Sequence, residues 1–151
     1  VQTWLEALRA GCDIVTDTQM AKAGINKTIL ASLGGEVHCF MSDPDVAAEA
    51  KSRGVTRAWV SMEKAAQLKK PCIFAIGNAP TALVSLDALM AAELLRPALL
   101  TGVPVGFVNV VQSKELIIEG GRAPYIVARG RKGGSNVAAA ICNALLYQIR
   151  R

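Results

Sequence analysis

Aromatic residues, histidine and long apolar runs are all scarce in this 151-residue sequence. Phenylalanine, tryptophan and tyrosine make up only 5% of the chain, and no basic run is interleaved with them. Proteins that bind single-stranded nucleic acid stack bases on aromatic side chains in a basic groove, so this class of partner is excluded. Although 52% of the residues are hydrophobic, no run approaches the roughly 20 apolar residues that span a membrane.

Paired cysteines and a targeting leader are absent as well. The four cysteines are widely spaced and form no Cys-x-x-Cys pair, so we interpret them as reduced, mostly buried thiols. No charged-then-apolar leader opens the chain, which favours a cytoplasmic protein. The chain starts at Val1, inside an expected amphipathic helix with Trp4, Leu5 and Leu8 on one face. We therefore expect that the N-terminal part of the domain has been removed or lies elsewhere.

What the sequence does contain is a steady alternation of short apolar, β-type runs with helical patterns. This alternation predicts an α/β fold of three layers, in which a mostly parallel sheet has helices on both faces. Because there is no internal repeat and no low-complexity linker, residues 1–151 are expected to form a single domain. Strands are predicted at 13–16, 37–41, 72–76, 98–101 and 125–128, and helices at 17–23, 42–53, 56–68, 79–94, 110–118 and 135–149.

The run at 76–83 is the first candidate for a binding loop, because it follows an apolar strand and opens a helix. Gly77 permits a sharp turn and the close approach of a ligand. Asn78 suits the N-cap of the helix, and Pro80 suits its first turn. This arrangement would leave free amide donors and a partial positive charge facing a cleft, so an anionic or polar ligand is expected there.

Three further strands are expected to end in loops of small and polar residues, at 16–17, 101–106 and 129–135. Because the carboxyl ends of parallel strands meet at one edge of a sheet, all four loops should line one glycine-rich, amide-rich crevice. The spacing fits neither the P-loop nor Gly-x-Gly-x-x-Gly, so a nucleotide is not indicated. The net charge of +5 would steer an acidic small molecule, or simply reflect a solvated surface.

The loop at 129–135 has the most specific chemistry of the four. Arg129, Arg131 and Lys132 flank glycines immediately before a predicted helix that starts at Ser135. An arginine can bind a carboxylate through two parallel hydrogen bonds, a geometry that lysine lacks. The loop therefore indicates a carboxylate site, although an ordinary turn with solvated arginines would have the same composition.

Four other side chains are candidates for the site or for its surroundings. Ser113 and Lys114 are placed either at the rim of the crevice, as carboxylate partners, or in a salt-bridged surface turn, and Arg57 is either a carboxylate partner as well or an ordinary surface residue. His38 is the only histidine, but it lies in an apolar strand, where a structural role is favoured over a catalytic one. The neighbouring Cys39 would point to the opposite face, so we expect no metal site here or elsewhere.

At these residues the sequence resembles precorrin-8X methylmutases, the methyl-shifting isomerases of cobalamin biosynthesis. The resemblance extends over essentially all 151 residues and keeps many short motifs in one order. The motifs are Ile14-Val15-Thr16-Asp17 with Met20 and Ala23-Gly24-Ile25, Asp43-Pro44, Thr56-Arg57, the runs 76–83 and 102–108, Ser113-Lys114-Glu115, Arg129-Gly130-Arg131 with Gly133-Gly134-Ser135, and Asn143-Ala144-Leu145.

The resemblance implies that a methyl group moves from ring carbon 11 to ring carbon 12 of precorrin-8X or cobalt-precorrin-8, without an organic cofactor. It also implies a homodimer whose sites are completed at the subunit interface, and a corrinoid substrate that is a polycarboxylate. Arg57 matches a family residue that contacts the substrate. The expected substrate-binding residues are Asp17, Arg57, Asn78, Thr81, Gly106, Ser113, Lys114, Arg129, Arg131 and Ser135.

One functional group of the family has no counterpart in the sequence. The family's general-acid histidine lies upstream of Val1 by motif position, and His38 falls where the family has an apolar residue. We therefore expect most of the binding pocket without the usual proton donor, and His38 as the only histidine that could replace it. An acid of this kind contributes about 10²- to 10⁴-fold to a rate. Two alternatives stay open: a corrinoid or polycarboxylate binding domain without chemistry, and a doubly wound domain for another anionic metabolite.

Overall fold

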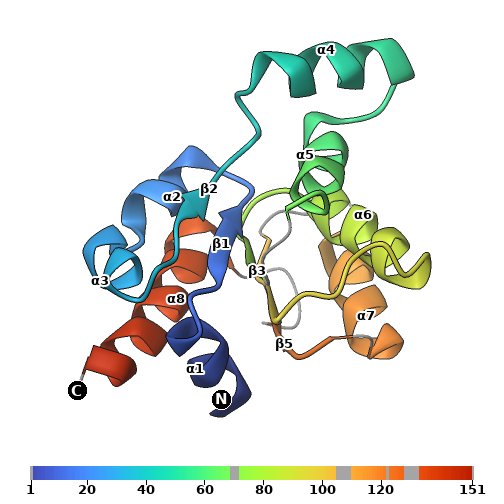
Figure 1. Cartoon of the computed structure of the whole chain (residues 1–151). Helices are drawn as coiled ribbons and strands as arrows, with labels where there is room; N and C mark the ends of the chain where they lie inside the picture. Colours follow the sequence, from blue (N-terminus) through green and yellow to red (C-terminus); the bar gives the residue numbers. More distant parts are fainter. Residues whose placement is uncertain (1, 69–71, 105–109, 122, 128–132, 151) are drawn as a thin grey trace.

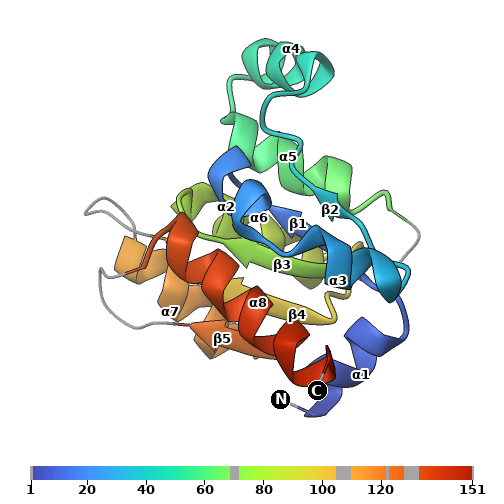
Figure 2. The same cartoon turned by 90° about the vertical axis from the view of Figure 1, so that its left-hand side faces the viewer.

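The computed structural model describes residues 2–68, 72–104, 110–121, 123–127 and 133–150, and within them five strands form one sheet. Every neighbouring pair of strands is parallel. The α/β architecture that the alternation predicts is thereby confirmed. In spatial order the strands are β2 (Val37–His38), β1 (Asp13–Thr16), β3 (Cys72–Ile76), β4 (Leu99–Gly102) and β5 (Tyr125–Val127) (Figures 1 and 2).

The three middle strands are buried along their whole length, as parallel strands with helices on both faces must be. Successive side chains alternate between two cores. Ile14 and Leu99 belong to one core, whereas Val15, Phe74 and Leu100 belong to the other. This double burial explains why β3 is a continuous apolar run in the sequence.

The first core lies under four helices, on the side of the sheet that faces the viewer in Figure 2. The long helix α8 packs against α2, α1 and the strand β3. Leu5 and Leu8 of α1 are buried, as expected, and the side chain of Trp4 lies outside the described residues. The four helices are α1 (Gln2–Arg9), α2 (Gln19–Gly24), α3 (Lys27–Ser32) and α8 (Ser135–Arg150).

The second core lies under α5 (Arg57–Ala65), α6 (Pro80–Ala91) and α7 (Val110–Gly120), on the opposite side of the sheet (Figure 1). Helix α6 packs between α5 and α7. Its buried residues include small ones as well as leucines, which lets it lie close to the sheet. Within the described part of the chain, no helix is both long and apolar enough to cross a membrane.

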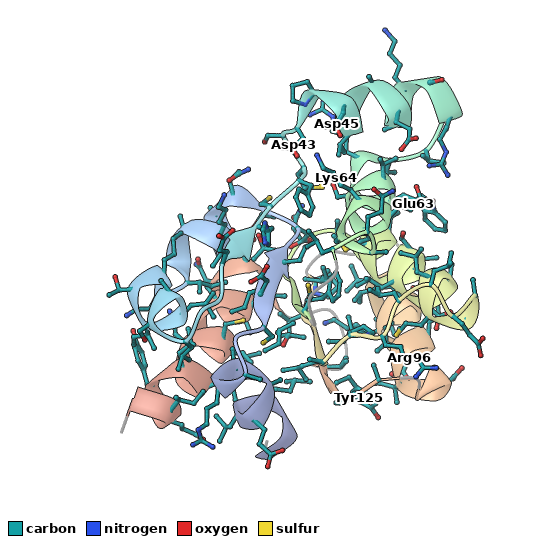
Figure 3. All side chains as sticks on the ribbon, viewed as in Figure 1. Asp43, Asp45, Glu63, Lys64, Arg96 and Tyr125 are labelled. Carbon is teal, nitrogen blue, oxygen red and sulfur yellow. The ribbon has the colours of Figure 1, made fainter. Side chains whose placement is uncertain are left out.

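Helix α4 (Pro44–Arg53) projects away from the sheet, beyond α5 (Figures 1 and 2). Its apolar contact is small and consists mainly of Val46 and Ala50 against Val60 of α5. An ion-pair cluster adds to it (Figure 3). The Lys64 ammonium lies 2.7 Å from the Asp43 carboxylate and 3.0 Å from that of Asp45.

Three predicted boundaries on the N-terminal side are wrong, for local reasons. The helix predicted at 42–53 begins at Pro44, because Asp43 is its N-cap and has an extended backbone. The second strand ends at His38 instead of continuing to 41, because the chain turns and the Asp43 N–H donates to the Phe40 carbonyl. The helix predicted from residue 17 begins at Gln19. Thr18 has an extended backbone and caps that helix through its side chain.

Helix α3 was not predicted, and two other helices are shorter than expected. Helix α3 has only six residues and begins at its N-cap Asn26, so its pattern is too short to show a helical period. The helix predicted at 56–68 ends at Ala65. The helix predicted to reach 94 ends at Ala91, since Glu93 adopts a left-handed backbone with φ of 60°.

Candidate functional site

The order of the strands creates a switch point between β1 and β3. From β1 the chain passes to β2 on one side, and after β3 it continues to β4 and β5 on the other side. In open α/β sheets the ligand crevice lies outside the carboxyl ends of the strands at such a point. The predicted loops after β1 and β3 leave the sheet at the expected edge, and the loops after β4 and β5 lie only in part within the described residues.

Asp17, the first residue after β1, bridges this switch point. It is only 1% exposed, and its Oδ1 accepts a hydrogen bond from the Gly77 N–H at 2.9 Å. Its Oδ2 accepts hydrogen bonds from the Asn78 and Ala79 N–H groups at 2.8 and 2.6 Å. Burial raises the pKa of the Asp17 carboxyl, and the three amides act in the opposite direction. The carboxylate thus ties the end of β1 to the turn between β3 and α6.

This contact shows that the predicted free amide donors at the start of α6 are not free. The N–H groups of Gly77, Asn78 and Ala79 are bound by Asp17, and Pro80 at the start of the helix has no N–H. Asn78 is not the N-cap either, because Ala79 holds that position without a side-chain hydrogen bond. The sequence could not reveal the acceptor, which lies 60 residues upstream of Gly77.

The start of α8 lies next to Asp17 and the turn before α6, on the side of the sheet that the first core covers. The Ser135 Oγ lies 2.8 Å from the Thr18 Oγ1, so the two hydroxyls share a hydrogen bond. The Gly134 N–H donates to the Val103 carbonyl at 2.7 Å. A Cβ on Gly77 would lie 2.6 Å from the Ser135 Cα, so this contact requires glycine. The end of β1, the turn after β3 and the first turn of α8 therefore meet at one place.

A second group of predicted residues lies at the N-terminal ends of α5 and α6. The Thr56 Oγ1 donates to the Thr81 Oγ1 at 3.2 Å, and Arg57, next to Thr56, is exposed to solvent. The guanidinium is therefore accessible to a ligand. A cavity of about 260 Å³ opens beside this group and is lined by Thr81, Val84, Gln112, Ser113 and Leu116.

Ser113 and Lys114 are both buried, so the interpretation as a salt-bridged surface turn is wrong, while Ser113 lines the cavity of about 260 Å³ from its packed position. Lys114 is 0% exposed and Ser113 is 2% exposed. The Ser113 Oγ donates to the Val110 carbonyl at 2.9 Å within α7. Burial lowers the pKa of the Lys114 ammonium. Both side chains lie on the packed face of α7 together with Ile117, at helical spacing, although their polarity suggested the outer face.

The basic end of the predicted crevice lies outside the described residues. Gly106 falls in the stretch 105–109, and Arg129 and Arg131 fall in the stretch 128–132. Their assignment as substrate-binding residues stays a prediction. The expected substrate-binding residues that the structure does describe are Asp17, Arg57, Asn78, Thr81, Ser113, Lys114 and Ser135.

His38 lies on the edge strand β2 and contacts Asp13. Its Nε2 is 2.9 Å from the Asp13 Oδ2, and its ring stacks on Phe40 with 5.6 Å between the ring centroids. Asp13 begins β1, whereas Asp17 follows its last residue, so the imidazole is directed toward the amino end of that strand. These contacts are typical of a structural histidine. The pair was not predicted, because 25 residues separate its members.

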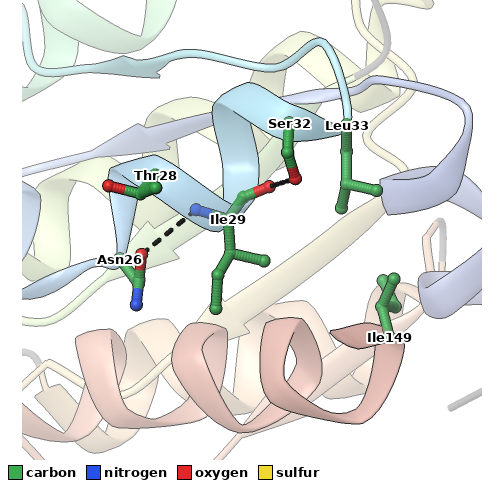
Figure 4. Close-up of a pocket in the computed structure, with 6 residues that line it drawn as sticks. All are labelled: Asn26, Thr28, Ile29, Ser32, Leu33 and Ile149. Carbon is green, nitrogen blue, oxygen red and sulfur yellow. Dashed lines mark hydrogen bonds between the residues drawn. The ribbon is translucent and has the colours of Figure 1, made fainter. Parts of the chain in front are cut away.

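A larger cavity lies away from this edge, between α3 and the end of α8 (Figure 4). It has a volume of about 580 Å³, and none of the described side chains that line it titrates: Asn26, Thr28, Ile29, Ser32, Leu33 and Ile149. The four cysteines are buried thiols, as expected. In the described ranges, no three His, Cys, Asp or Glu side chains are grouped so that they could hold a metal ion.

Comparison with known proteins gives the same family as the motifs. The family model described as Precorrin-8X methylmutase matches residues 1–148. The chain is 48% identical over 146 residues to the cobalt-precorrin-8 methylmutase of Salmonella typhimurium, and the match covers 96% of this chain and 67% of that protein. It is 44% identical over 153 residues to the protein of the same name from Leptospira interrogans, with coverages of 97% and 70%.

Solved structures agree with the sequences. The crystal structure of a precorrin-8X methylmutase from Thermus thermophilus matches with a TM-score of 0.87 at 36% identity, over 99% of this chain and 72% of that chain. A precorrin-8X methylmutase related protein matches with a TM-score of 0.86 at 30% identity, over 97% and 76%. This chain thus spans about two thirds to three quarters of these relatives. Sequence, motif order and fold coincide over nearly its whole length, and the chain belongs to the precorrin-8X methylmutase family.

Proposed function

We propose that this chain is a methylmutase of corrin-ring biosynthesis. It moves the methyl group from ring carbon 11 to ring carbon 12 of precorrin-8X or cobalt-precorrin-8. The observation that carries this proposal is the family match over residues 1–148, supported by two relatives named cobalt-precorrin-8 methylmutase at 44–48% identity. Because the reaction is an isomerisation, no group is gained or lost. The protein has to hold a large polycarboxylate and control its protons.

The macrocycle is proposed to lie across the carboxyl ends of β1, β3 and β4. The exposed guanidinium of Arg57 would bind a substrate carboxylate on one side, and Ser135 would contact the substrate on the other side. Arg129 and Arg131 would bind further carboxylates. Gly106 would let the substrate approach the backbone.

The remaining expected residues divide into two groups by their exposure. Asn78 is exposed and Thr81 lines the cavity of about 260 Å³, so both are proposed to contact the substrate directly. Asp17, Ser113 and Lys114 are buried, and they are proposed to act by holding the loops and helices that carry the direct contacts.

We do not assign the proton donor to His38. Its Nε2 is engaged by the Asp13 carboxylate, toward the amino end of β1, while the proposed crevice lies beyond the carboxyl end. No other histidine occurs in the sequence.

The oligomeric state, the compartment and the domain organisation are parts of the same proposal. We propose a homodimer, by resemblance to the family. A cytoplasmic location is proposed because a reducing compartment would preserve the four buried thiols. Residues 1–151 are proposed to act as a single domain.

The test is a titration of the purified chain with a hydrogenobyrinate-type corrin, followed by its visible absorbance. We expect saturable binding that Arg57→Ala weakens about tenfold, the effect of losing one charge-assisted hydrogen bond of about 1.5 kcal/mol. Arg96→Ala is the matched control, because Arg96 is also exposed but precedes the amino end of β4. Saturable binding without turnover of precorrin-8X would instead favour a corrinoid-binding domain. The absence of any spectral change would contradict both functions.

A further inference from the structure

The backbone N–H groups of the turn before α6 are hydrogen-bonded to a carboxylate of the same chain, that of Asp17. Three consecutive N–H groups, those of Gly77, Asn78 and Ala79, converge on the two oxygens of the Asp17 carboxylate at 2.6–2.9 Å. Pro80 follows at the first position of the twelve-residue helix and contributes no donor. These amides are the ones that would hold a ligand's phosphate or carboxylate in many α/β proteins. Here a residue of the chain occupies them.

The Asp17 carboxylate makes the amino end of α6 less attractive to a ligand anion. The amino end of a helix carries a partial charge of roughly +0.5, which normally attracts a ligand anion. A full negative charge fixed 2.6–2.9 Å from the preceding amides opposes that attraction. A substrate carboxylate placed at the same point would therefore be repelled by the Asp17 carboxylate. It would also find the three backbone N–H groups already hydrogen-bonded. The substrate's carboxylates must be bound by other groups along the edge, such as the exposed Arg57.

We infer that Asp17 is a positioning residue for the proposed methylmutase: its carboxylate holds the turn before α6 so that Asn78 and Thr81 meet the macrocycle in a fixed geometry. This inference rests on the proposed function. Asn78, within the turn, is exposed to solvent, and Thr81, two residues after the turn, lines the neighbouring cavity, so both are accessible to a ligand. Asp17 itself, at 1% exposure, stays beneath them.

A carboxylate suits this task better than any neutral side chain of the same size. Its two oxygens can accept all three hydrogen bonds, and charge-assisted bonds are about twice as strong as neutral ones. An asparagine would offer one oxygen and would turn an NH₂ group toward at least one backbone N–H. Asp17→Asn should therefore release part of the turn while leaving the packing volume almost unchanged.

The turn can be followed directly by NMR, through the amide signals of Gly77, Asn78 and Ala79. We expect Asp17→Asn to shift these three signals more than any others. The same variant should weaken binding of the hydrogenobyrinate-type corrin at least tenfold. Gly54→Ala is the matched control, because it strains a left-handed residue beyond α4, away from the turn, and should leave the affinity unchanged.

A chemical rescue separates positioning from general damage. Asp17→Ala removes the carboxylate, and added formate should restore both the three amide signals and the affinity for the corrin. If Asp17→Asn shifts the amides but binds the corrin as tightly as the wild type, the positioning role is overturned. If formate restores the amides of Asp17→Ala without restoring affinity, it is overturned as well.

Failure of the proposed function would look different. In that case the wild-type chain gives no spectral change with the corrin, and the positioning role falls together with the function. The amide signals would still respond to Asp17→Asn and to formate, because they report the hydrogen bonds and not the ligand. Should Asp17→Asn fail to fold, Asp17→Ala with formate supplies both measurements.

Discussion

The hydroxyls of Thr18 and Ser135 lie 2.8 Å apart, although 117 residues separate them in the chain. Thr18 also accepts a hydrogen bond from the Ala21 N–H at 3.0 Å and so caps α2. One side chain thus serves both the start of α2 and its junction with α8. This junction lies beside Gly77, whose missing side chain lets the first turn of α8 approach. Several consequences of this geometry can be measured.

Removing the Thr18 hydroxyl should cost more stability than removing its partner. Thr18→Val loses the helix cap and the hydroxyl pair, each worth about 1 kcal/mol, so the free energy of unfolding should fall by about 2 kcal/mol. Ser135→Ala loses only the pair and should cost about 1 kcal/mol. Thr18→Ser keeps both contacts and is the control. Urea denaturation measures all three, and equal losses for Thr18→Val and Ser135→Ala would refute the double role.

The two glycine positions Gly77 and Gly54 should respond differently to alanine. At Gly77 the new Cβ would lie 2.6 Å from the Ser135 Cα and 2.8 Å from Gly134 backbone atoms, which cannot move independently. We expect a loss of about 3 kcal/mol from this overpacking. Gly54 has φ of +68° but open space around it, so Gly54→Ala should cost only about 1 kcal/mol. Similar losses in thermal or urea denaturation would contradict the close approach.

Burial of Lys114 should make the stability of the protein depend on pH in the alkaline range. Because burial lowers its pKa in the folded state below the ordinary value of 10.5, the unfolded chain binds the proton more tightly. The free energy of unfolding of the wild type, measured relative to Lys114→Met, should therefore rise as pH increases toward 10.5. Urea titrations between pH 7 and 10 test this direction, with the exposed Lys51→Met as control. A difference that falls with pH would exclude the buried, deprotonation-prone lysine.

The cysteines should be unreactive in the folded protein. All four are buried, and burial raises the pKa of the Cys142 thiol to about 12. A thiol reagent at pH 8 should therefore label no cysteine of the native chain at an appreciable rate, and should label all four in denaturant. Ser52→Cys, at an exposed position of α4, should react at once and serves as the positive control. Rapid labelling of the wild type would show that the core opens readily.

The sheet and the edge at which its loops begin could be predicted from the sequence because both depend on local patterns. Strands that are buried on both faces leave continuous apolar runs, and their parallel order places the following loops at one edge. What could not be predicted depends on partners that are distant in sequence. Asn78 satisfies every local rule for an N-cap, yet Asp17 supplies the acceptor.

The burial of Lys114 could not be predicted from the sequence either, because it depends on how α7 packs against its neighbours. A lysine between a serine and a glutamate is usually on the solvated face of a helix. The structure instead turns it inward on α7, in line with Ile117. Only the position of α7 against the sheet decides which face is covered, and that position is set by contacts with α6 and β5.

Helix α4 has a consequence for how the molecule opens. It rests on α5 through a few small apolar side chains, the Lys64 ion pairs and the exposed ion pair between Arg53 and Glu63, while the sheet is closed on both faces by other helices. Segments held by so little apolar contact exchange their amide hydrogens through local opening, with free energies well below that of global unfolding. The segment from Asp43 to Gly54 should therefore be the first to exchange and the first to be cut by a protease. Its loss would leave the edge that carries Asp17 and Ser135 intact.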